Sequence, residues 1–359
     1  MMNKISLIEN ACKELLSYGV WDGRSRCKYV VKRYLLRRET AKEDLIFWPT
    51  GLLAAGLWNC REELIKNGTQ QSIGMIENAL AAYYGRWLKK GMPIMVIDDL
   101  LAGETLLHIY QEMREESRTN LLGLSQETVK EALDKLAAYA AGHPVDGTGS
   151  FRYRPAHDST FVFADGIGLA CPFLYRYGEI LGKTEYRELA VRQVVNFLSY
   201  GMDGGTGLPY HGYDMTDGYK YGIIGWGRAA GWMLRGMAGC LSSDYGRQRL
   251  EEPYREMVKA VLTWQRPDGC FSWQLQALEG PADTSATGMI CAALAQGMAQ
   301  QVFAGQDCEK ALSAGKKALK KSVRDGLVYD CSGECEGFSC YPQRYGAYPW
   351  SLGPALEIL

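Results

Sequence analysis

The sequence predicts an all-α fold, a closed barrel of six helical hairpins, and three observations point to it. Apolar residues recur at helical spacing through most of the 359 residues, whereas the period-two alternation typical of strands is scarce. Glycine-led, aromatic-rich segments recur at intervals long enough for two helices with their connections. No Pro-rich or Ser-rich linker and no charge run divides the chain, so we expect residues 1–359 to form one domain.

The helical periodicity is clear in the first third of the chain. Ile76, Leu80 and Trp87 fall on one face of a helix, and Leu100 and Leu107 belong to the next such stripe. Along the whole chain the pattern predicts twelve helices, which pair as six hairpins: residues 5–18, 49–66, 71–90, 99–113, 126–142, 166–182, 184–200, 227–242, 252–266, 284–302, 307–322 and 350–359.

Four of the predicted loops share a glycine that is followed by aromatic residues. These glycines, Gly149, Gly207, Gly269 and Gly326, are 58, 62 and 57 residues apart. Hairpins repeated at this interval can stack side by side, each burying a face that its neighbour completes. Solenoid families repeat every ~33 to 47 residues, so the longer interval favours a closed barrel. In such a barrel the aromatic loops gather at one end and line a concave site.

Composition restricts the partners and the compartment. The chain has 40 Lys plus Arg against 41 Asp plus Glu, so no net charge favours nucleic acid or an anionic membrane. We expect a small-molecule substrate and a monomer or homodimer. Eleven scattered cysteines fit the reduced thiols of a cytoplasmic protein. The N-terminal residues lack the apolar core of a signal peptide, and no apolar run approaches the ~18 residues of a membrane span.

The common cofactor motifs do not fit. Residues 225–230 satisfy the dinucleotide pattern G-x-G-x-x-G/A, but no strand–turn–helix unit surrounds them and the bulk of Trp226 would obstruct the turn. The four histidines form no H-E-x-x-H pair, and Cys331, Cys335 and Cys340 form no C-x-x-C pair, so we interpret these cysteines as coincidence. No G-x-S-x-G elbow is present. We therefore expect neither a metal nor a nucleotide cofactor.

Carboxylates are the remaining candidates for chemistry. Asp165 stands between an apolar stretch and a predicted helix, where it either caps the helix or acts as an acid whose pKa is raised by Phe161 and Phe163. Asp98 and Asp99 stand at the head of another helix and allow the same two interpretations. If two of these carboxylates meet, their pKa values separate, which leaves one protonated and one charged.

Residues 203–232 are dense in aromatic rings with polar edges. Such rings suit a sugar, which has C–H faces and a hydroxyl rim, although core packing would explain about half of them. Arg228, if it is buried among them, needs an anion, either a substrate carboxylate or a structural Asp or Glu. The polar-edged residues of this segment are Tyr210, His211, Tyr213, Tyr219, Tyr221, Trp226, Arg228 and Trp232.

Three stretches together resemble a known family. Residues 163–166 (Phe-Ala-Asp-Gly), 207–214 (Gly-Leu-Pro-Tyr-His-Gly-Tyr-Asp) and 226–232 (Trp-Gly-Arg-Ala-Ala-Gly-Trp) resemble the unsaturated rhamnogalacturonyl hydrolases of glycoside hydrolase family 105. The unsaturated glucuronyl hydrolases of family 88 are related. Weaker matches, at residues 48–51, 97–103 and 285–286, extend the resemblance over most of the chain.

The resemblance implies a six-hairpin α/α barrel that hydrates a 4,5-unsaturated uronic acid at the non-reducing end of a lyase product. A carboxylic acid protonates carbon 4, water adds at carbon 5, and the hemiketal opens to release the aglycone. The implied substrate is unsaturated galacturonosyl-rhamnose. An unsaturated glucuronyl substrate and a non-catalytic sugar-binding toroid are the alternatives.

The resemblance also implies residue roles. Asp165 would be the general acid and base, and Asp98, five residues before Gly103, the second carboxylate, with Asp99 as the fallback. The substrate-binding residues are expected to be Trp48, Asp99, Tyr210, His211, Trp226, Arg228 and Trp232.

Two positions depart from the family pattern. Phe163 replaces the usual Trp, and the loop before Asp165 reads Phe151-Arg152-Tyr153-Arg154, with His157 displaced. The arginines of this loop either favour an anionic aglycone or are simply solvated.

Overall fold

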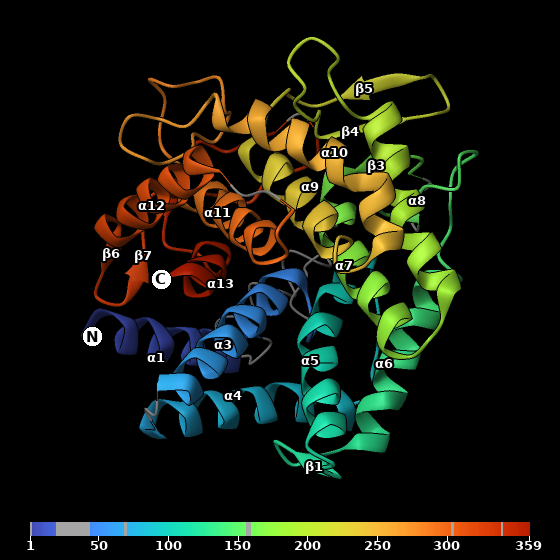
Figure 1. The fold of residues 1–359 in the computed structure, drawn as a ribbon, viewed down its shortest axis with the longest axis vertical. Helices are drawn as coiled ribbons and strands as arrows, with labels where there is room; N and C mark the ends of the chain where they lie inside the picture. Colours follow the sequence, from blue (N-terminus) through green and yellow to red (C-terminus); the bar gives the residue numbers. More distant parts are fainter. Residues whose placement is uncertain (1, 19–43, 68–69, 156–158, 303–304, 339) are drawn as a thin grey trace, which may run out of the picture.

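The structure is a computed structural model that describes residues 2–18, 44–67, 70–155, 159–302, 305–338 and 340–359. Twelve α-helices are found in these residues, and the predicted all-α fold is confirmed (Figure 1). They are α1 (Met2–Ser17), α3 (Trp48–Asn67), α4 (Gln70–Lys89), α5 (Ala102–Glu115), α6 (Gln126–Ala141), α7 (Ala164–Ile180), α8 (Thr184–Tyr200), α9 (Gly227–Gly239), α10 (Asp244–Leu262), α11 (Thr284–Ala299), α12 (Gln306–Lys321) and α13 (Pro349–Ile358).

Each predicted helix is present, and α10 departs most from its predicted bounds. It begins at Asp244 instead of residue 252 and continues through Pro253. Proline is common at the first position of a helix, which is why the sequence suggested a later start. Here the helix accommodates the proline in its interior.

The six helices α3, α5, α7, α9, α11 and α13 form a closed inner ring in which each packs on the next and α13 packs back on α3 (Figure 1). The other six lie outside it. Helix α1 packs against α13, so the two ends of the chain lie side by side and close the ring.

Burial follows the sequence pattern of each helix. Every residue of the inner helix α9 is buried, as expected for a helix surrounded by others. The outer helix α12 buries one stripe, Cys308, Ala311, Gly315, Ala318 and Leu319, and is otherwise polar. No helix in the described ranges is long and apolar enough to cross a membrane.

The four repeated glycines have the conformation that their loops require. Gly149, Gly207, Gly269 and Gly326 have φ values of 84°, 69°, 90° and 71°, a left-handed region that favours glycine. Each loop connects an outer helix to the next inner helix. All four therefore gather at the end of the barrel where the inner helices begin, as predicted.

The strands are short and belong to the loops. β3 (Val162–Phe163), β4 (Gly212–Asp214) and β5 (Tyr219–Tyr221) form an antiparallel sheet. Phe163 pairs with Gly212, and the Ala164 N–H donates to the His211 carbonyl at 2.9 Å. The sheet thereby fixes His211 beside the start of α7. The remaining strands form two-stranded antiparallel pairs: β1 (Asn120–Leu121) with β2 (Leu124–Ser125), β6 (Val323–Arg324) with β7 (Leu327–Val328), and β8 (Cys331–Ser332) with β9 (Tyr345–Gly346).

Close contact between α7 and α9 depends on Gly168. A Cβ atom at this position would lie 2.6 Å from both the ring and the backbone oxygen of Trp232. We expect Gly168→Ala to lower the free energy of unfolding by about 1–3 kcal/mol, because backbone atoms have to move. Chemical denaturation measures the loss. Gly74→Ala is the matched control, since its Cβ would meet nothing within 4 Å, and it should stabilise α4 by about 0.5–1 kcal/mol. Equal effects at the two positions would contradict the packing argument.

Candidate active site

The predicted site residues collect where the inner helices begin. Trp48 is the first residue of α3, Asp165 lies in the first turn of α7, and Arg228 lies in the first turn of α9. Asp98 lies in a 3₁₀ helix, η3 (Ile97–Leu101), immediately before α5. Side-chain contacts connect these helix starts, so residues far apart in the sequence share one end of the barrel.

Asp99 has a structural role. It is fully buried, and its Oδ2 accepts hydrogen bonds from the backbone N–H groups of Met95 at 2.7 Å and Val96 at 3.4 Å. Its carboxyl group also hydrogen-bonds the side chain of Asp44, and burial beside that second carboxyl raises the pKa of Asp99 well above its usual range. Asp98 and Asp99 were each expected either to cap the helix or to act as an acid. The capping interpretation therefore applies to Asp99.

Asp98 faces the site instead. Its exposed fraction is 1%, its Oδ2 accepts a hydrogen bond from the Tyr153 hydroxyl at 2.9 Å, and its Oδ1 is buried without a partner among the described residues. Burial raises the pKa of Asp98, and the nearby charge of Asp165 raises it further. Arg154 and the Tyr153 hydroxyl lower it, and the net result is a pKa of about 7. A carboxyl group with this pKa carries a proton over much of the range below neutrality.

Asp165 does not cap its helix. Phe163 occupies the N-cap position of α7 and no side chain caps the helix there, so the capping interpretation of Asp165 is wrong. Its Oδ2 lies 3.2 Å from Nε2 of His211. Neither atom has a geometrically satisfactory hydrogen-bond partner in the described structure. The fully buried His211 ring is held on its other side by Tyr341, whose Oη lies 2.8 Å from Nδ1.

An aromatic wall surrounds the His211 ring. Tyr153 stacks on Phe163 with ring centroids 4.4 Å apart, and Phe338 lies 4.2 Å from Phe163. The His211 ring packs 4.8 Å from Phe163 and 4.4 Å from Trp226. Phe163 therefore contacts the His211 ring, whereas Phe161 packs against Tyr221 and Phe338. The wall offers C–H faces and polar edges to a sugar.

Three tryptophans from three inner helices pack together. Trp48 contacts Trp232 edge to face at 6.0 Å and lies 5.2 Å from Trp350. Trp350 donates a hydrogen bond from Nε1 to the Ser332 carbonyl at 3.0 Å. Trp48 and Trp232, predicted sugar contacts from opposite halves of the sequence, are therefore brought together.

Arg228 is buried and bound largely by the protein itself. It donates from Nη1 to the Ser332 hydroxyl at 2.6 Å and carbonyl at 3.0 Å, and from Nη2 to the Gly333 carbonyl at 2.7 Å. The carboxylate of Asp283 lies 3.8 Å away, and the ring of Trp226 lies 4.8 Å from the guanidinium carbon. Asp283 is thus the structural anion that the sequence left as an alternative to a substrate carboxylate.

Comparison with known proteins assigns the family. The profile of glycosyl hydrolase family 88 matches residues 26–345. The chain belongs to glycosyl hydrolase family 88. It is thus a glycoside hydrolase, and the resemblance drawn from its motifs is confirmed.

Relatives and solved structures agree with this assignment. The hydrolase is 24% identical over 289 residues to the unsaturated rhamnogalacturonyl hydrolase YesR of Bacillus subtilis, over 79% of this chain and 81% of YesR. A possible family 105 member from Klebsiella pneumoniae superposes with a TM-score of 0.81 at 15% identity, over 100% of this chain and 92% of that one. The unsaturated glucuronyl hydrolase of Bacillus sp. GL1 superposes with a TM-score of 0.67 at 18% identity, over 98% and 95% of the two chains. These likenesses support the α/α barrel.

Some residues near the site differ from expectation or were missed. Tyr210 faces the Lys220 ammonium, 5.7 Å from its ring centroid, and has no recorded contact with the carboxyl groups among the described residues. Arg152 donates to the Ser159 carbonyl at 2.8 Å and so ties its own loop together. His157 lies outside the described residues. Sequence reasoning did not assign Tyr153 or Tyr341 to the site. Tyr153 lies in the loop that departs from the family pattern, and Tyr341 lies in a segment for which no motif was found.

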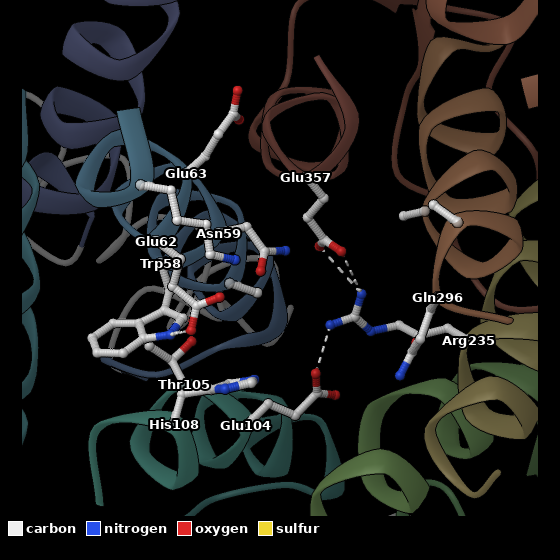
Figure 2. Close-up of a pocket in the computed structure, with 14 residues that line it drawn as sticks. Trp58, Asn59, Glu62, Glu63, Glu104, Thr105, His108, Arg235, Gln296 and Glu357 are labelled. Atoms are coloured by element: carbon white, nitrogen blue, oxygen red, sulfur yellow. Dashed lines mark hydrogen bonds and ion pairs between the residues drawn. The ribbon is translucent and has the colours of Figure 1, made fainter. Parts of the chain in front are cut away.

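A separate cavity of about 460 Å³ lies among α3, α5, α9, α11 and α13 (Figure 2). Arg235 crosses it and binds Glu104 at 2.7 Å and Glu357 at 3.2 Å, which joins α5, α9 and α13. Burial lowers the pKa of the nearby His108 to about 4, so this ring is neutral at physiological pH. Arg235 is therefore paired with two carboxylates in this cavity.

Proposed function

We propose that this hydrolase removes a 4,5-unsaturated uronic acid from the non-reducing end of oligosaccharides left by polysaccharide lyases, with unsaturated galacturonosyl-rhamnose as its substrate. The observation that carries the proposal is the pair of unlike carboxyl groups at one aromatic-lined mouth. Asp98 is buried with its pKa raised to about 7, and Asp165 lies 3.2 Å from an imidazole nitrogen. In such a pair one carboxyl group can be protonated and donate its proton, while the other is ionised and can accept one.

The reaction adds one water molecule across the double bond. The pair delivers its proton to carbon 4, the electrons of the double bond form the new C–H bond, and positive charge develops at carbon 5. Water attacks carbon 5 and returns its proton to the pair, so the carboxyl groups end as they began. The resulting hemiketal opens and releases the aglycone. Carboxylate separation, which distinguishes retaining from inverting glycosidases, has no bearing on this route.

The other site residues are assigned to binding. Trp48 and Trp232 supply the stacking surface for the unsaturated ring, and Trp226 supports His211. His211 orients Asp165. Arg228 anchors the segment at Ser332 and Gly333 and so shapes the mouth from within, with Asp283 as its counter-ion. Tyr210 has the weakest support of the predicted contacts, because its ring faces Lys220.

The aglycone is the less constrained part of the substrate. The similarity to YesR supports a rhamnogalacturonan-derived substrate. An unsaturated glucuronyl substrate is the second candidate, supported by the family 88 match. We place the hydrolase in the cytoplasm as a monomer or homodimer, in keeping with its scattered cysteines and balanced charge.

The conjugated double bond provides a direct test. On incubation with lyase-generated unsaturated galacturonosyl-rhamnose, the ultraviolet absorbance of the substrate should disappear with enzyme turnover. Loss only with unsaturated glucuronyl disaccharides would select the second candidate. If neither substrate loses absorbance while either one raises the melting temperature, the chain is a sugar-binding toroid.

A further inference from the structure

The side chain of Tyr341 reaches the site from a segment near the C-terminus and contacts His211, 130 positions earlier in the sequence. Its Oη lies 2.8 Å from His211 Nδ1, and the opposite ring nitrogen, Nε2, lies 3.2 Å from Asp165 Oδ2. The three side chains thus form a chain that ends on a carboxyl group of the proposed acid–base pair.

The neighbours of the imidazole select one of its neutral tautomers. The Ile223 backbone N–H donates a hydrogen bond to Tyr341 Oη at 3.4 Å, which occupies one lone pair of this oxygen and leaves its O–H to donate to Nδ1. With Nδ1 as the acceptor, the neutral ring carries its proton on Nε2, toward Asp165. The other tautomer would turn the Nε2 lone pair toward a carboxylate oxygen, which is repulsive.

The surroundings preserve this arrangement. Burial raises the pKa of Tyr341, so it remains a phenol throughout the working pH range. Gly222, with φ of 82°, passes so close that a Cβ atom there would lie 2.5 Å from His211 Cβ and 2.7 Å from Tyr341 Oη. Rings of Trp226 and Trp273 pack 5.7 and 6.0 Å from the Tyr341 ring. A glycine backbone and two indole rings therefore confine the tyrosine hydroxyl to one place.

We propose that Tyr341 is a positioning residue that holds His211 in the tautomer with its proton on Nε2, the ring nitrogen that lies 3.2 Å from Asp165 Oδ2. The consequence for turnover rests on the proposed function, whereas the tautomer itself does not. Tyr341 acts through His211 and need not touch the substrate.

The tautomer is measured by ¹⁵N nuclear magnetic resonance of the full chain, in which protonated and unprotonated imidazole nitrogens resonate far apart. The His211 signals are assigned by their absence from His211→Gln. In the native protein near pH 7, Nδ1 should be unprotonated and Nε2 protonated. Tyr341→Phe should give a mixture of tautomers. A protonated Nδ1 with an unprotonated Nε2 in the native protein, or an unchanged spectrum in Tyr341→Phe, would overturn the proposal whatever the reaction is.

Kinetics on the unsaturated disaccharide test the consequence. Tyr341→Phe should lower kcat by about 10- to 100-fold with little change in KM, because His211 then carries its proton on Nε2, beside Asp165, in only part of the molecules. Tyr345→Phe is the control from the same segment, since its hydroxyl bonds only the exposed Gln343 in the described structure, and it should retain native kcat. An altered tautomer with native kcat would refute positioning for catalysis. If the unmodified protein does not turn over the unsaturated disaccharide, the proposed function is refuted instead.

Discussion

Asp165→Asn should lower kcat by about 100- to 10,000-fold while the protein remains folded. The amide can neither donate a carboxyl proton to carbon 4 nor accept one from water, yet it has nearly the shape of the carboxylate that it replaces. Asp165 makes no capping hydrogen bond, so its loss leaves α7 intact. The rate of absorbance loss measures activity, and chemical denaturation measures the free energy of unfolding.

Asp244→Asn is the matched control for this variant. Asp244 is also an aspartate in the first turn of a helix, α10, but it is exposed on the outside of the barrel. It should keep native kcat and lose at most about 0.3–1 kcal/mol of stability from the helix dipole. If Asp165→Asn behaved like Asp244→Asn, Asp165 would have no part in the chemistry.

Asp98→Asn should inactivate the hydrolase and yet stabilise its fold at high pH. The pKa of Asp98 is raised from ~3.9 in an unfolded chain to about 7 in the folded protein. Because the folded protein binds this proton more tightly than the unfolded chain, protonation of Asp98 contributes its full stabilisation of the fold below pH ~4. This stabilisation is lost as the pH rises toward 7. Three pKa units correspond to about 4 kcal/mol, so a neutral Asn should raise the free energy of unfolding by about 1–4 kcal/mol at pH 8 and change it little at pH 4.

Urea denaturation of native protein and Asp98→Asn at pH 4 and pH 8 measures this difference. A variant that is destabilised equally at both values would show that Asp98 serves only as a structural hydrogen-bond partner of Tyr153. The pH profile gives a second reading. Native activity should decline above pH ~7 as Asp98 loses its proton, and a profile that stays flat there would argue against a protonated Asp98 in turnover.

The fold was largely accessible from the sequence. Helix positions could be predicted because apolar residues face the core and polar residues face the solvent. This pattern repeats every 3.6 residues and can be read from a short stretch of sequence. The loop glycines could be recognised in the sequence because each repeat needs a residue that adopts a left-handed backbone, which favours glycine. The φ of 90° at Gly269 illustrates this requirement. Helix α10 was placed too late because a proline inside a helix resembles one at its start.

The motifs of the sequence by themselves indicated the family, the barrel, and Asp165, His211 and Asp98 as the residues to examine. They did not decide which of two adjacent aspartates faces the site. Only the tertiary structure separates them, because the 3₁₀ turn directs Asp99 to the N–H groups of Met95 and Val96 and leaves Asp98 to Tyr153. The same holds for Tyr341 and Asp283. Their partners lie 130 and 55 positions away, and such contacts exist only once the ring of inner helices has closed.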